Sequence, residues 1–265
     1  MLPTSSTNVQ ALRRRALSLA LPMALAATLA PRVADATSKF SIANIFFELN
    51  STAGDLGVHV SLDGESWKEL TIKDPLGRSI MDLEPEGSAA KIGLTELFFE
   101  GSEPPLVDVS YARFLKLFPP GDYVFHGKTT GNQLIRNTDA LTAELACPVK
   151  VVSPPTDRAI APDKVVIRWQ AVPGVFNPDT GICRKNRDVG LASYEVIAEI
   201  ANEARGLVRH YTVELPAGAT EVPVPREFIE EGLRFRGTEF KLEVIAIEDS
   251  GNKTITEGTF QVEAP

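Results

Sequence analysis

The sequence has few of the side chains on which enzyme chemistry usually depends. Its 265 residues include two cysteines and three histidines. It contains no Gly-x-Ser-x-Gly nucleophile elbow, no His-Glu-x-x-His pair and no paired cysteine spacing. A hydrolase triad or a zinc enzyme therefore has no motif here, and we expect surface or structural roles for His59, His126 and His210. The formal net charge of -8 argues against a general nucleic-acid binder, because such binding needs clustered lysines and arginines.

Long apolar runs are also scarce, and the one that occurs, at residues 16–30, follows three arginines at 13–15. This order is typical of a secretory signal peptide, and the small-x-small sequence at residues 34–36 predicts cleavage after Ala36. The alternative is an uncleaved anchor helix, which two prolines in this region disfavour. Removing residues 1–36 leaves 23 basic and 34 acidic residues. We therefore predict an exported, acidic protein, periplasmic or extracellular, with no membrane span in its mature part.

The rest of the chain has the pattern of a β protein. Glycine and proline contribute 19 residues each, which suits a turn-rich fold. Apolar residues alternate with polar ones in short segments, at 57–62, 68–74, 121–130, 163–172, 194–200, 210–225 and 240–252. Residues 110–118 have helical spacing instead, and 259–265 reads as a closing edge strand. Because Pro154-Pro155 cannot lie within a strand ladder, we predict a β-rich N-terminal domain at 37–146 and a second antiparallel β domain at 147–265.

Three features of the second half resemble the fibronectin type III family. Trp169 is similar to the core tryptophan of that family, residues 237–246 to its penultimate strand, and residues 249–252 to the turn after it. The resemblance covers about residues 150–263 and implies an immunoglobulin-like β-sandwich. One departure is Phe240, which stands at the position of the corner tyrosine, so the hydroxyl contact of that corner is missing.

The same resemblance bears on the two cysteines. Cys147 lies where such a sandwich begins its first strand, and Cys183 lies in the long segment between its second and third strands. These two regions are close together in a type III sandwich, so the resemblance implies a Cys147–Cys183 disulfide in an oxidising compartment. The alternative is two buried thiols.

The first half resembles, at residues 94–100 and 118–125, a domain that precedes fibronectin type III modules in secreted bacterial proteins. That resemblance brings no activity with it. No Arg-Gly-Asp sequence occurs either, so integrin-type adhesion has no motif in this chain.

The segment "NSTAGDLG" at residues 50–57 is rich in oxygen ligands. A helix-loop-helix calcium loop that began at Asn50 would need glycine at its sixth position and glutamate at its twelfth, but Asp55 and Ser61 stand there. We therefore interpret the segment as a turn between two strands. An irregular calcium site formed by Asn50, Asp55 and Asp63 is the alternative. Apart from that calcium ion, we expect no cofactor.

Trp67 is the residue that we expect to offer a binding surface. It shares strand parity with Glu69 and opposes Leu70, which places its ring toward solvent; packing at a strand end is the alternative. By the same argument His59, between two valines, should lie on a solvent-facing side.

Taken together, these patterns favour a non-catalytic binding, adhesion or structural protein with a protein or glycan partner. The alternatives are a carbohydrate-binding accessory protein that uses Trp67 and a hydrolase with an unrecognised site in the N-terminal domain.

Overall fold

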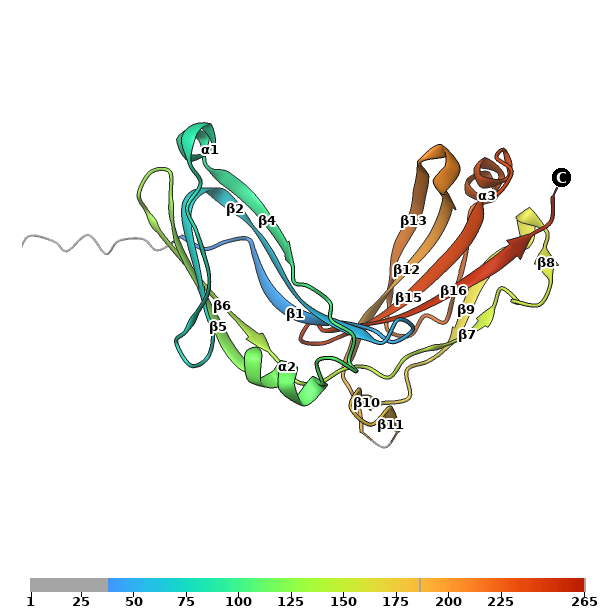
Figure 1. Cartoon of the computed structure of the whole chain (residues 1–265), viewed down its shortest axis with the longest axis horizontal. Helices are drawn as coiled ribbons and strands as arrows, with labels where there is room; N and C mark the ends of the chain where they lie inside the picture. Colours follow the sequence, from blue (N-terminus) through green and yellow to red (C-terminus); the bar gives the residue numbers. More distant parts are fainter. Residues whose placement is uncertain (1–37, 186, 265) are drawn as a thin grey trace, which may run out of the picture. The chain divides into compact units, whose positions relative to one another are not determined.

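The computed structural model describes residues 38–185 and 187–264, so the predicted signal peptide lies outside the described residues. The described residues belong to one compact unit, and this unit is mainly β with largely antiparallel sheets (Figure 1). Among its helices, none is both long and apolar enough to cross a membrane.

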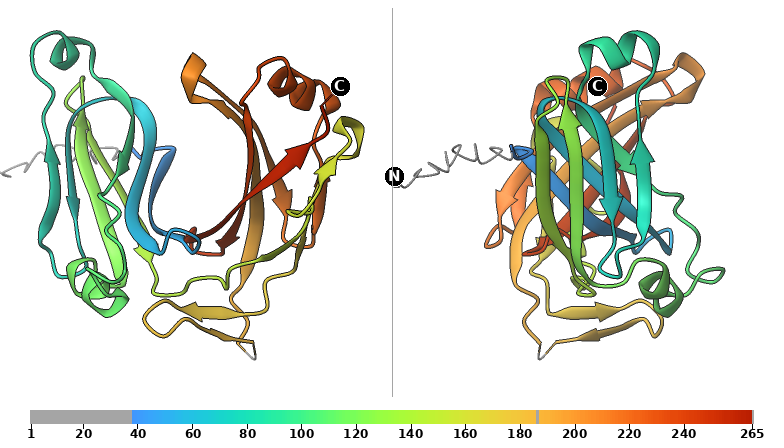
Figure 2. Two further views of the ribbon diagram at one scale, coloured as in Figure 1. Left: turned by 45° about the vertical axis from the view of Figure 1, so that its right-hand side comes forward. Right: turned by 90° about the vertical axis from the view of Figure 1, so that its left-hand side faces the viewer.

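The first half is organised around one long strand. Its elements are β1 (Ile42–Asn50), β2 (Asp55–Lys73), β3 (Ser79–Leu83), α1 (Gly87–Ile92), β4 (Leu94–Glu100), α2 (Tyr111–Leu117), β5 (Gly121–Thr129) and β6 (Leu134–Leu141). The strand β2 pairs with β1, β3, β4 and β5, and β5 in turn pairs with β6, beside which it runs in both views of Figure 2. The predicted helix at 110–118 is confirmed as α2, which Ser110 caps by accepting a hydrogen bond from the backbone of Arg113.

The second half is a two-sheet sandwich, as predicted. Its elements are β7 (Lys150–Ser153), β8 (Ala159–Ile160), η1 (Pro162–Lys164), β9 (Val166–Gln170), β10 (Val175–Asn177), β11 (Ile182–Arg184), β12 (Leu191–Asn202), η2 (Glu203–Arg205), β13 (Leu207–Pro216), β14 (Glu221–Pro223), α3 (Arg226–Leu233), β15 (Glu239–Glu248) and β16 (Lys253–Val262). One sheet has the order β14-β9-β7, and the other contains β13-β12-β15-β16. This three-plus-four arrangement is that of a fibronectin type III-like sandwich.

The last strand is not the edge strand that the sequence suggested. One side of β16 pairs with β15, and its other side pairs in parallel with β1, where Glu48 opposes Lys253 and Asn50 opposes Ile255. A single sheet therefore runs β13-β12-β15-β16-β1-β2-β5-β6 through both halves. Within the segment predicted as an edge, Gln261 and Val262 also pair in parallel with β8, which covers hydrogen-bonding groups that an edge would expose. The prediction failed because a parallel partner about 100 residues away leaves no local signal in the sequence.

Two hydrophobic clusters fill the interior. The first draws its buried residues from positions 40–145, and the second from positions 146–260. Trp169 belongs to the second cluster, where it packs edge-on against Tyr194 at 5.2 Å between ring centroids, and Phe240 is buried there against Phe260. The two clusters fit the proposed division of the chain at Cys147, which itself stays a prediction.

Candidate functional site

The polar segment at residues 50–57 forms a turn and begins β2, and its predicted calcium ligands do not converge. Asn50 pairs with Asp55 at one end of the β1–β2 hairpin, and its side-chain oxygen accepts hydrogen bonds from two backbone N–H groups of the turn. Asp63 pairs with Ile42 at the other end, eight residues further along β2, or about 26 Å away. The three side chains cannot share one ion, so the prediction that groups them is wrong.

Trp67 does not face solvent. Its exposed fraction is 0%, and it lies in the first hydrophobic cluster together with Leu70 and Ile72. The pairing of β2 shifts register between Trp67 and Glu69, and this irregularity breaks the strand alternation on which the prediction depended. The expected aromatic binding surface is therefore absent at this position, and with it the reason to propose a sugar site there.

The predicted disulfide is confirmed. Cys147 and Cys183 are bonded, and they lie 36 residues apart in the sequence. Cys183 lies on β11, in the short β10–β11 hairpin inserted between β9 and β12. Asp179 in this hairpin accepts hydrogen bonds from the first two backbone N–H groups of α2, at 2.6 and 2.9 Å. The inserted hairpin therefore joins the start of the second half to the helix of the first.

Removing this disulfide should destabilise the fold. We expect the double substitution Cys147→Ser and Cys183→Ser to lower the free energy of unfolding by about 2–5 kcal/mol, because the bond no longer restricts the unfolded chain. Urea unfolding of the wild type and the double variant measures the loss. Adding reductant should not change the stability of the double variant further. If reductant also left the stability of the wild type unchanged, the prediction would be contradicted.

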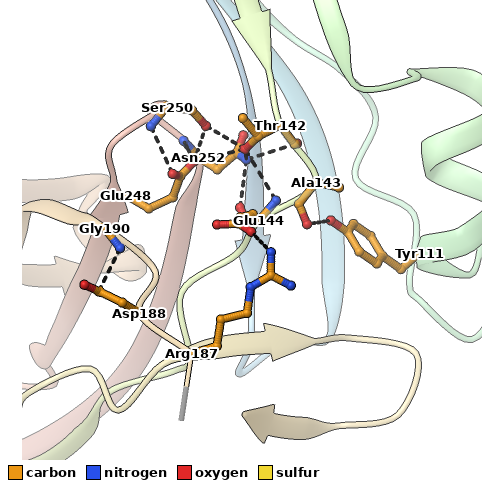
Figure 3. Close-up of polar contacts among 10 residues, drawn as sticks. All are labelled: Tyr111, Thr142, Ala143, Glu144, Arg187, Asp188, Gly190, Glu248, Ser250 and Asn252. Carbon is orange, nitrogen blue, oxygen red and sulfur yellow. Dashed lines mark hydrogen bonds and ion pairs between the residues drawn. The ribbon is translucent and has the colours of Figure 1, made fainter. Parts of the chain in front are cut away.

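A polar network connects the segment at residues 142–144 with the turn between β15 and β16 (Figure 3). Its centre is Asn252, which is fully buried. Its amide nitrogen donates to the carbonyl of Glu144 at 2.8 Å and to the carbonyl and hydroxyl of Thr142 at 3.2 and 3.0 Å. Its side-chain oxygen accepts from the backbone N–H of Phe47 on β1 at 2.8 Å. These contacts fix the register in which β1 meets the second half.

Carboxylates gather next to this network without forming a ligand set. A hollow of about 610 Å³ is lined there by Asp139, Glu144, Asp188, Glu248 and Asp249 among others. Glu248 is buried, but it accepts hydrogen bonds from Ser250 and from the backbone of Asn252, and Glu144 pairs with Arg187. Because Glu248 and Glu144 already have protein partners, they stabilise the turn between β15 and β16 and its contact with residues 142–144.

A different group of carboxylates covers one face of the sheet that runs through both halves. Residues opposed across neighbouring strands share a face, as do residues two apart on one strand. The pairings therefore put eight acidic residues of β1, β12, β13, β15, β16 and the start of β2 on one side, which we call the acidic face: Glu48, Asp55, Glu195, Glu199, Glu214, Glu239, Glu243 and Glu257. Further along β2 and on β4, the same side continues with Asp63, Glu96 and Glu100. Lys241 and Lys253 lie on the same face, and each pairs with carboxylates there, the first with Glu199 and the second with Glu48 and Glu195.

The acidic face holds charges that repel one another. Burial and the neighbouring Glu257 raise the pKa of both Glu243 and Asp55. One oxygen of Asp55 is buried and has no hydrogen-bond partner among the described residues. At Glu199 burial raises the pKa, but hydrogen bonds from His210 and Lys241 outweigh it and leave the pKa lowered. The face therefore has more negative charge than its two lysines compensate.

His59 lies at the margin of this face, and it is buried, with an exposed fraction of 2%, contrary to the prediction. Its ring stacks on Phe46 at 5.3 Å and meets the edge of Phe98 at 5.8 Å. Its Nε2 lies 3.2 Å from Oε1 of Glu103 and 3.8 Å from Oε1 of Glu48. The sequence pattern missed this because the burial comes from Phe98 and Glu103, some 40 residues away along the chain.

The segment that carries Glu103 runs along β2 in an extended conformation. The backbone N–H of Gly101 donates to Val58, that of Leu106 donates to Gly54, and Pro105 bridges Asp55. Glu103 reaches His59 only because residue 57 is glycine. A Cβ at that position would lie 2.8 Å from Oε1 of Glu103 and 3.0 Å from Nε2 of His59.

The other two histidines are in less enclosed places. His210 is exposed and contacts Glu199 at 2.9 Å. His126 lines a hollow of about 460 Å³ with Glu69, but that carboxylate is held by Lys128 at 2.6 Å. Burial, Lys73 and Arg136 lower the pKa of His126. The lining of this hollow contains neither a serine nor a cysteine, so within the described residues it offers no nucleophile of the kind a hydrolase triad uses.

No protein-family model and no curated protein matches the chain. Solved structures that align with it include a tetra-tandem repeat from the extending region of a large adhesion protein, at 12% identity and a TM-score of 0.28, over 84% of this chain and 50% of that one. The FN1–FN3 domains of chicken CNTN1 align at 8% identity and a TM-score of 0.32, over 85% and 68%. A 1.5-MDa bacterial ice-binding adhesin aligns at 13% identity and a TM-score of 0.25, over 86% and 66%. This chain spans half the length of the first, and at these TM-scores we draw no conclusion from the alignments.

Proposed function

We propose that the chain is an exported, non-catalytic binding or adhesion protein whose acidic face binds a positively charged protein surface. The observation that carries this proposal is the gathering of eight carboxylates on one sheet face with only two lysines among them. Such a field attracts cationic partners and raises the rate at which they associate.

Two further features support the proposal. The Cys147–Cys183 disulfide fits an oxidising compartment outside the cytoplasm. The carboxylates with raised pKa values, Glu243 and Asp55, are costly to keep charged without a cation beside them.

Neutralising the acidic face should abolish most of the binding. In a triple variant with Glu195→Gln, Glu199→Gln and Glu243→Gln, we expect retention of the cationic partner from a cell-envelope extract to fall about tenfold or more, since three charge contacts of about 0.5–1 kcal/mol each are lost. Binding of the wild-type protein should also weaken as salt rises, because added ions screen the charges. Quantitative pull-down with the immobilised mature chain measures both effects.

A matched control keeps the number of lost charges constant. The substitutions Glu84→Gln, Glu86→Gln and Glu227→Gln neutralise three exposed carboxylates away from the acidic face and should leave retention unchanged. Equal retention by the acidic-face variant and this control, or binding that does not change with salt, would contradict the proposal.

A further inference from the structure

Three side chains that commonly bind metals come together around His59. One ligand atom each from His59, Glu48 and Glu103 lies within 4.8 Å of the other two. Nε2 of His59 lies 3.2 Å from Oε1 of Glu103 and 3.8 Å from Oε1 of Glu48. In a tetrahedral zinc site with bonds of about 2.0–2.1 Å, neighbouring ligand atoms are about 3.3–3.4 Å apart. The three atoms therefore need only small side-chain movements to surround one ion.

The protein holds these ligands in place from several elements. Phe46 stacks on the imidazole and Phe98 contacts it edge-on, so the ring has a fixed orientation. Gly57 leaves the space that lets Glu103 approach the histidine. In a preorganised metal site the ligands have fixed orientations and enough space to approach one another. A simple surface ion pair needs neither feature.

The charges around the cluster also favour a cation. The carboxylates Glu48 and Asp55 lie near Glu103, and their negative charges repel its own. Lys253 lies 3.7 Å from Oε2 of Glu48, so it compensates the oxygen of Glu48 that does not face the histidine. A dication between the three ligand atoms would balance the remaining negative charge.

We propose that His59, Glu48 and Glu103 bind a divalent transition-metal ion of the zinc type, with water as the fourth ligand. One imidazole and two carboxylates suit zinc, whereas calcium takes six to eight oxygen ligands. The site requires no partner protein and is independent of the proposed function. Metal ligands bind in their deprotonated forms, so the binding measurement is made near neutral pH.

Calorimetric titration of the EDTA-treated mature chain with Zn²⁺ near neutral pH tests this site. We expect one ion per chain in the wild type and at least about tenfold weaker binding in Glu103→Gln and in Glu48→Gln, since losing even an outer-shell partner costs about 10–100-fold. Glutamine keeps the size of each side chain and can still hydrogen-bond, so the fold should tolerate both substitutions. Thermal melts of the metal-free variants check this.

His210→Ala is the matched control, because His210 also contacts a carboxylate but lies outside the cluster, and it should bind zinc like the wild type. As a second measurement, zinc should shift the ring ¹⁵N resonances of His59 and leave those of His126 and His210 in place. The proposal would be overturned if the wild type did not bind zinc, or if both glutamine variants bound it as tightly as the wild type. Loss of binding in His210→Ala would also overturn it.

Discussion

Replacing Asn252 by alanine should lower the free energy of unfolding by about 3–5 kcal/mol. The substitution leaves the backbone N–H of Phe47 and the carbonyls of Thr142 and Glu144 without their partner in a buried place. Each such group costs about 1–3 kcal/mol when unsatisfied, and some relaxation will reduce the sum. Urea unfolding measures the loss, and hydrogen exchange should show faster exchange of the Phe47 amide, because this contact fixes β1 against the turn that precedes β16.

The control for this prediction is Asn44→Ala. Asn44 lies on the same strand as Phe47 but is exposed, and its loss should change the free energy of unfolding by less than about 0.5 kcal/mol. If both alanine variants were equally stable, the network of Figure 3 would not hold the two halves in register.

Replacing Trp67 by alanine should cost about 3–5 kcal/mol of stability. The side chain is completely enclosed in the first hydrophobic cluster, and its removal leaves a cavity that the surrounding strands cannot close. The indole nitrogen has no hydrogen-bond partner among the described residues, so Trp67→Phe should cost much less than the alanine substitution. Thermal and urea unfolding of the two variants measure the difference.

The prediction also separates the two interpretations of Trp67. Replacing a buried residue lowers stability, whereas replacing a solvent-facing residue that contacts a ligand weakens binding and leaves stability almost unaffected. An alanine variant within about 0.5 kcal/mol of the wild type would contradict the burial of Trp67.

Local patterns in the sequence predicted most of the architecture. Strand alternation located β9, β12, β13, β14 and β15, and helical spacing located α2. The similarity to type III sandwiches placed Cys147 near Cys183, and the bond between them is confirmed. These predictions succeeded because alternation, turn residues and family resemblance are properties of short, continuous segments.

The candidate site could not be predicted in the same way. Strand parity put both Trp67 and His59 toward solvent, but a register irregularity turns the first into the core, and Phe98 and Glu103 cover the second. The polar segment at 50–57 attracted attention as a possible ion site, yet the ligands that converge are Glu48, His59 and Glu103. Glu48 and His59 each lie two residues outside that segment, but Glu103 is far from it in sequence.

The sequence by itself determined that the chain is mainly β and where its principal strands and one helix lie. The tertiary structure alone decided that β1 pairs with β16, that eight carboxylates share one sheet face, and that His59 meets two glutamates. The physical reason is the distance along the chain over which each effect acts. Strand alternation and turn residues act within a few residues, whereas the acidic face and the cluster around His59 arise from pairing between strands that are distant in sequence.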